Sequence, residues 1–319
     1  ASAGRRAGPP VAAGTGVVVG TSADGSAAYV EEIDPAVSRS GCEGRPEPVM
    51  FRLPLTGGPK ELLGTPRSPL RGLVVRGGGG RAAVVDACEG FLSALRVGNE
   101  APDGRLSDLK VVDLPGGASR PLPAGVGWSV DGTVLLLASG SSVVRLDPAT
   151  GASSKVFDVT GGRGVLSQVA ELADGSYVVG GRRQVSLRDR KGVVRATFEG
   201  DGFTVSPDGR RLVVLAADGA LSVFENGSGT PSALLGADPG ATVEVAQFSP
   251  AGDAVVFVRT NGAESTLSVV PVVERRAVLV SSRGPFGRPY FSGDGRAVVF
   301  NQFETGPDRV TQVVVSRLS

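Results

Sequence analysis

The chain has 319 residues, more than a single hydrophobic core usually fills, so two domains or a repeat array are expected. Its 33 basic and 32 acidic residues give a net charge of +1, and the basic residues occur in pairs rather than blocks, so no nucleic-acid partner is expected. Histidine is absent, which excludes a Ser-His-Asp triad, a Cys-His pair and histidine-ligated zinc.

The composition favours an all-β chain. The 48 glycines and 22 prolines are spread among many valines, and no long stretch has helical periodicity. This pattern predicts many short strands joined by tight turns. Only four of the basic residues are lysines, the bias expected of a GC-rich genome. There is no apolar run of about 18 residues, so no membrane span is expected in this chain.

One pattern recurs seven times: a short extended segment, a turn of the Asp-Gly type and an aliphatic strand. In chain order the copies are TSADGSAAYV, RGGGGRAAVV, WSVDGTVLLL, ELADGSYVVG, VSPDGRRLVV, FSPAGDAVVF and FSGDGRAVVF. Every copy has glycine at the second turn position, and these glycines are 55, 52, 43, 34, 43 and 43 residues apart. Repeats of about 40–50 residues with four strands each are typical of propeller blades.

The repeats predict one β-propeller domain over residues 1–319. Seven four-stranded blades are expected, with six as the alternative, and their starts fall near residues 14, 69, 124, 165, 201, 243 and 286. The last unit ends at Ser319 after its third strand. Because a propeller must cover its strand edges, an N-terminal strand around 9–13 is expected to close the ring as the fourth strand of the last blade. The alternative is a loose N-terminus.

Three of the turns, SPDG at 206–209, SPAG at 249–252 and SGDG at 292–295, resemble the TolB-type, WD40-like (PD40) β-propeller repeats. The resemblance extends from about residue 14 to the end. The Trp-Asp and Gly-His signatures of true WD40 repeats are missing, and the second copy replaces its turn with a run of glycines. The resemblance implies an extracytoplasmic protein that contacts protein or cell-envelope partners, with any signal peptide or anchor lying upstream of this sequence.

Two units carry long segments between their second and third strands. These are EIDPAVSRSGCEGRPEP in blade one and ACEGFLSALRVGNEAPDGRLS in blade two. Adjacent blades would place both insertions side by side on one face. Each contains one of the two cysteines, Cys42 and Cys88, so a disulfide in an oxidising compartment is expected. Two free thiols are the alternative.

The inner strands of a propeller line its central channel, and their starts are expected on the face of the long loops. Polar or aromatic candidates for a ligand site at the channel mouth are Arg71, Trp128, Gln168, Asp201, Glu244, Gln247, Arg288 and Tyr290. Glu244 and Asp201 are candidate ligands of a cation such as calcium, and Glu244 with Tyr290 is a candidate pair for proton transfer. The alternative is that these are solvated rim residues or inter-blade hydrogen-bond partners. For Trp128, the only tryptophan, a core role is expected.

Two functional hypotheses follow. The first is a monomeric, non-catalytic extracytoplasmic propeller without a cofactor, which binds a protein or cell-envelope partner through its loop-bearing face. The second places a site at the channel mouth. It would make the chain a carboxylate- or calcium-dependent hydrolase, lyase or isomerase, or a binder of a small molecule or glycan. Glu244, Asp201, Arg288 and Tyr290 are the residues that would distinguish the second hypothesis.

Overall fold

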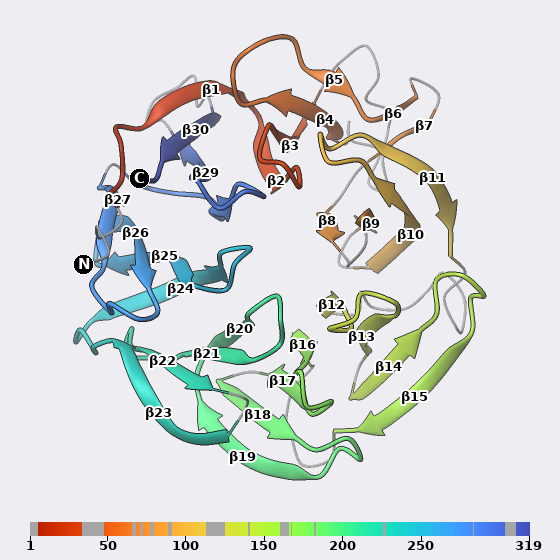
Figure 1. Cartoon of the computed structure of the whole chain (residues 1–319), viewed down its shortest axis with the longest axis vertical. Helices are drawn as coiled ribbons and strands as arrows, with labels where there is room; N and C mark the ends of the chain where they lie inside the picture. The colour runs from red at the N-terminus through yellow and green to blue at the C-terminus, as the bar shows by residue number, and fades with distance from the viewer. Residues whose placement is uncertain are drawn as a thin grey trace.

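The protein is a seven-bladed β-propeller (Figure 1). The computed structural model describes residues 6–33, 48–65, 68–70, 73–76, 80–88, 91–112, 125–139, 141–159, 166, 168–181, 183–225, 228–282, 284–303 and 311–319. Their strands form seven antiparallel sheets of four strands each, arranged as a ring, and a short two-stranded sheet. The predicted all-β fold with seven four-stranded blades is therefore confirmed.

Each blade is a meander that starts at the axis of the ring. Blades one to three comprise β2 (Val17–Thr21), β3 (Ala27–Glu32), β4 (Val49–Pro54) and β5 (Glu61–Leu62); β8 (Leu73–Arg76), β9 (Arg81–Cys88), β10 (Phe91–Glu100) and β11 (Leu106–Val111); and β12 (Gly125–Trp128), β13 (Leu135–Ser139), β14 (Ser142–Leu146) and β15 (Ser153–Asp158). The short pair β6 (Gly64–Thr65) and β7 (Ser68–Pro69) lies between blades one and two in the chain.

The remaining four blades follow the same plan. They comprise β16 (Gln168–Glu171), β17 (Tyr177–Gly181), β18 (Gln184–Arg188) and β19 (Val194–Glu199); β20 (Gly202–Val205), β21 (Arg211–Leu215), β22 (Leu221–Glu225) and β23 (Ser228–Leu235); β24 (Ala241–Phe248), β25 (Ala254–Asn261), β26 (Glu264–Pro271) and β27 (Val278–Ser281); and β28 (Tyr290–Phe291), β29 (Ala297–Phe303), β30 (Thr311–Arg317) and β1 (Val11–Thr15).

An N-terminal strand closes the ring, as predicted. Strand β1 pairs antiparallel with β30, so the first strand of the chain is the outermost strand of the last blade. It spans Val11–Thr15 rather than residues 9–13, because Pro9 and Pro10 have no N–H to contribute to the ladder. The two chain ends meet beside it, where the main-chain nitrogen of Arg6 donates to Ser319 at 2.9 Å. Figure 1 shows both termini on the same side of the ring.

The seven tight turns share one backbone conformation. Their glycines, Gly25, Gly80, Gly132, Gly175, Gly209, Gly252 and Gly295, have φ between +67° and +76°, a region that favours glycine. In four copies the serine hydroxyl donates to the turn aspartate, at 2.9 Å from Ser22 and 2.5–2.6 Å from Ser129, Ser206 and Ser292. In each of these copies the aspartate also accepts the main-chain N–H two residues later, which closes an Asx turn.

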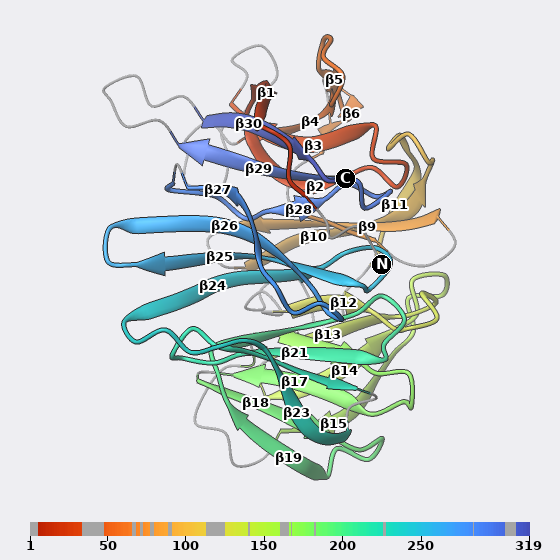
Figure 2. The same cartoon turned by 60° about the vertical axis from the view of Figure 1, so that its left-hand side comes forward.

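The hydrophobic core lies between blades. Among the described residues, each cluster of buried apolar side chains joins two neighbouring sheets. One of them packs Val213, Leu221 and Val223 of blade five against Phe248 and Phe257 of blade six. Figure 2 shows the same arrangement from the side, with neighbouring blades stacked as layers. Since a blade buries its faces only against other blades, the closed ring is the unit that excludes water.

Blade two corrects the sequence analysis. The segment interpreted there as an insertion contains the third strand itself, because β10 pairs with β9 along its length, with Val97 opposite Ala83. The segment interpreted as the third strand is the outer strand β11. Residues Leu95 and Val97 alternate into the core, which is the strand signal that was missed. Of the two expected loops, residues 34–47 and 89–90 lie outside the described residues, as do Cys42 and the side chain of Cys88.

Candidate functional site

The inner strands converge on a hollow at one end of the channel. Because every blade begins at the axis and meanders outward, β2, β12, β16, β20 and β24 run in the same direction and end on the same face. The tight turns lie on this face, which we call the turn face. A hollow of about 500 Å³ opens there, and its lining includes Thr21, Tyr29, Trp128, Ser129, Val130, Ala170, Glu171, Val205, Ser206, Gln247, Phe248, Tyr290 and Phe291.

Aromatic side chains from separate blades form part of this wall. Trp128 ends β12, and Tyr290 begins β28 on the other side of the ring. The Tyr290 side chain is buried, and burial raises the pKa of its phenol. The positive charge of Arg288, whose guanidinium carbon lies 5.9 Å from the ring centre, lowers this pKa, and the negative charge of Glu31 raises it. The phenol is therefore neutral near pH 7.

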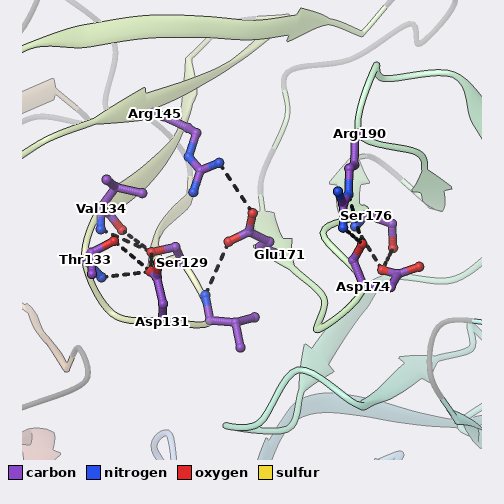
Figure 3. Close-up of polar contacts among 10 residues, drawn as sticks. Ser129, Asp131, Thr133, Val134, Arg145, Glu171, Asp174, Ser176 and Arg190 are labelled. Atoms are coloured by element: carbon purple, nitrogen blue, oxygen red, sulfur yellow. Dashed lines mark hydrogen bonds and ion pairs between the residues drawn. The ribbon is translucent and has the colours of Figure 1, made fainter.

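Glu171 is the only formally charged side chain among the described residues that line the hollow. It ends β16, and its side chain is 12% exposed. One carboxylate oxygen accepts the main-chain N–H of Val130 at 3.3 Å, and the other lies 3.6 Å from the guanidinium of Arg145 on the neighbouring blade (Figure 3). Burial and the charge of Glu171 raise the pKa of the Tyr177 phenol, and the charge of Arg145 lowers it.

Gln247 contributes a hydrogen-bond acceptor with no partner. It is the second-last residue of β24 and lines the hollow. Its Oε1 atom is buried, yet it accepts no hydrogen bond from any described residue. A buried acceptor without a donor costs about 1–3 kcal/mol, so a ligand that supplies a donor here gains affinity.

The turn aspartates around the mouth have structural roles. Asp131 accepts from the hydroxyls of Ser129 and Thr133 and from the Thr133 main chain (Figure 3). The Ser129 hydrogen bond lowers the pKa of Asp131 most. Asp174 accepts from Ser176 in the same figure, and its main-chain carbonyl accepts from Arg190. Among the described residues, no three of His, Cys, Asp and Glu lie close enough together to hold a metal ion.

The structure brings three of the residues singled out from the sequence into the hollow: Trp128, Gln247 and Tyr290. Trp128 also packs against the core between blades two and three, which agrees with the expected core role. Arg288 is exposed and stacks on Tyr290. Arg71 lies outside the described residues.

Three further candidates do not line the hollow. Gln168 begins β16, and its Oε1 accepts the Phe203 N–H at 3.1 Å, which joins blades four and five. Asp201 precedes β20 and is exposed, and Glu244 is an exposed residue of β24. The inner strands therefore carry these three toward the other end of the channel.

Sequence reasoning missed Glu171, although the repeat contains a signal for it. Counting back four residues from each turn glycine gives an apolar residue in four blades (Trp128, Val205, Phe248 and Phe291), Thr21 and Arg76 in blades one and two, and Glu171 in blade four. A carboxylate at a position that is apolar in most copies marks a departure from the repeat. The partner Arg145 comes from a different blade, which no local pattern indicates.

The comparisons with known proteins add no family. No family model matches the chain, and no curated protein does. Among the described residues no helix is long and apolar enough to span a membrane.

Proposed function

We propose that the chain is a non-catalytic interaction module that binds a segment of a partner polypeptide in the hollow on the turn face. The observation that carries this proposal is the wall of the hollow: aromatic and aliphatic side chains interspersed with a few hydrogen-bonding groups, around about 500 Å³. This volume is within the range of ligand sites, and the lining combines apolar faces with hydrogen-bonding groups that could orient a bound segment.

The state of the ionisable groups supports binding over catalysis. Glu171 is engaged by Val130 and Arg145, and the raised pKa of Tyr290 keeps its phenol protonated at neutral pH. A general base near pH 7 needs a pKa near that value and access to substrate. Glu244 and Tyr290, the pair considered for proton transfer, do not share one site, because only Tyr290 lines the hollow.

The cellular setting is part of the same proposal. The likeness of the turns at 206–209, 249–252 and 292–295 to TolB-type repeats supports an extracytoplasmic monomer with a protein or cell-envelope partner. A Cys42–Cys88 disulfide would fit an oxidising compartment. Strand β3 ends on the opposite face, and a partner that also reaches that face is part of the proposal. No cofactor is proposed for the binding itself.

The test is a selection of random peptides displayed on phage. Binders are selected on the native chain and measured against two variants. Val130→Tyr narrows the mouth from a rim residue that is 37% exposed, and Glu264→Ala changes an exposed residue of the β25–β26 hairpin on the other face. We expect selected peptides to lose binding to Val130→Tyr and to keep it with Glu264→Ala. Peptides that bind both variants equally would contradict the proposal.

A further inference from the structure

The hollow offers hydrogen-bond acceptors, so it favours ligands that carry hydrogen-bond donors. The described polar lining groups that retain acceptor capacity include Glu171 and Gln247. Glu171 accepts the Val130 N–H at 3.3 Å and lies 3.6 Å from the guanidinium of Arg145, whereas a carboxylate offers about four acceptor positions. Gln247 Oε1 receives no donor from the described residues. A ligand rich in N–H groups matches both.

The charge of the side chains that line the hollow also favours a ligand with cationic donors. No cationic side chain appears among the described lining residues, and Arg145 approaches Glu171 from outside the hollow at a separation beyond hydrogen-bonding range. An anion entering here would face the carboxylate of Glu171 directly. A cation would instead gain its attraction, in a partly buried setting where water screens less than at the surface.

The aromatic wall selects the kind of cation. Trp128 lines the hollow, and indole is the best of the side-chain rings for binding a cation on its face. Arg288 on Tyr290 shows that an arginine already stacks on one of the aromatic rings that line the hollow. A guanidinium is planar, weakly hydrated and carries five donors, so it stacks and reaches separated acceptors better than an ammonium does.

We propose, resting on the function proposed above, that the hollow on the turn face binds the guanidinium of an arginine side chain presented by the partner polypeptide. Glu171 supplies the charge, Gln247 the second acceptor and Trp128 the stacking surface. Blade two has Arg76 at the position that corresponds to Glu171 and Trp128 in the repeat, and its side chain lies outside the described residues. The experiment therefore includes a variant of Arg76.

Trp128 is the only tryptophan of the chain, so tryptophan fluorescence comes from one side chain, which lines the hollow. The probes are the tripeptide acetyl-Gly-Arg-Gly-amide and its citrulline and lysine counterparts. Citrulline keeps the shape of arginine without the charge. We expect a saturable fluorescence change with the arginine peptide, and at least about tenfold weaker binding of the citrulline peptide, because charge-assisted hydrogen bonds are the stronger class.

Two variants and a matched control test the residues. Glu171→Gln and Gln247→Met each preserve approximate shape and should weaken the arginine peptide by about tenfold. Glu225→Gln removes a carboxylate that is 59% exposed and pairs with Arg211 outside the hollow, so binding should not change. Thermal unfolding of each variant tests whether it is folded. If Glu171→Gln does not fold, Gln247→Met alone tests the site.

Every other outcome overturns the inference. Equal binding of the citrulline or lysine peptide excludes a guanidinium site, and so does the absence of any saturable change. If the arginine peptide binds only to Arg76→Gln, the chain's own Arg76 occupies the guanidinium position. The native chain then does not bind an arginine of a partner, and the inference is wrong. The proposed function is tested separately from the guanidinium site. Selected peptides that require an open mouth but contain no arginine would support the proposed function and contradict the guanidinium site. Selected peptides that ignore Val130→Tyr contradict it whatever the tripeptides do.

Discussion

Asn301 joins the last blade to the first, and replacing it tests how the ring is closed. Its side chain is 1% exposed and lies on β29. The Oδ1 atom accepts the Val18 N–H at 2.7 Å, while Nδ2 donates to the Gly16 carbonyl at 2.6 Å. Both partners belong to the start of blade one. The residue at the same distance from the turn glycine is apolar in blades three, five and six, where it is Ala138, Leu215 and Val258.

The variant Asn301→Leu leaves the N–H of Val18 and the carbonyl of Gly16 without these partners. Each buried group left unsatisfied costs about 1–3 kcal/mol, so the two together should destabilise the closure of the ring by roughly 2–6 kcal/mol. A factor of ten corresponds to about 1.4 kcal/mol, so exchange of the Val18 amide hydrogen should accelerate more than about tenfold.

The assay is hydrogen–deuterium exchange, read at Val18 and at an amide in blade five such as Val213. The control Val258→Ala removes apolar volume from the same position of blade six and should leave Val18 unaffected. Unchanged Val18 exchange in Asn301→Leu would refute the reasoning, as would equal acceleration at Val18 and Val213.

Three further perturbations follow from the turns and the closing strand. Gly209→Ala should lower stability by more than about 2 kcal/mol in urea unfolding, because φ is +70° and a Cβ would lie 2.7 Å from Ala173 N. Gly57→Ala, with φ +91° and open space around it, should cost only about 1 kcal/mol; equal losses would contradict the steric argument. Hydrogen bonds lower the pKa of Asp131 below its ordinary 3.8, so its contribution is complete above that pH and is lost as the pH falls through the folded-state pKa. Asp131→Asn should therefore flatten the acid limb of thermal stability, and an unchanged limb would remove Asp131 as its cause. Deleting residues 6–15 should lower the thermal midpoint, since β30 would lose its partner β1 and present an open edge; an unchanged midpoint would show that the β1 pairing is dispensable.

The sequence alone was sufficient for the architecture. Turn chemistry is local, because an Asp-Gly pair and the serine before it determine the backbone over four residues, and all seven turn glycines have the conformation that their position requires. The regular spacing of these turns then predicts the blades. The end of the last unit after three strands predicts a closing strand from the N-terminus, although not its exact bounds.

Only the tertiary structure decided what the blades bring together. The third strand of blade two was mistaken for an insertion because the repeat is degenerate there and strand pairing is not a local property. The hollow draws residues from β12, β16, β24 and β28, which are far apart in the sequence. The contact of Glu171 with Arg145 joins two blades, as does that of Gln168 with Phe203. Such contacts depend on how the ring curves and which way each strand faces, and these are fixed by packing between sheets.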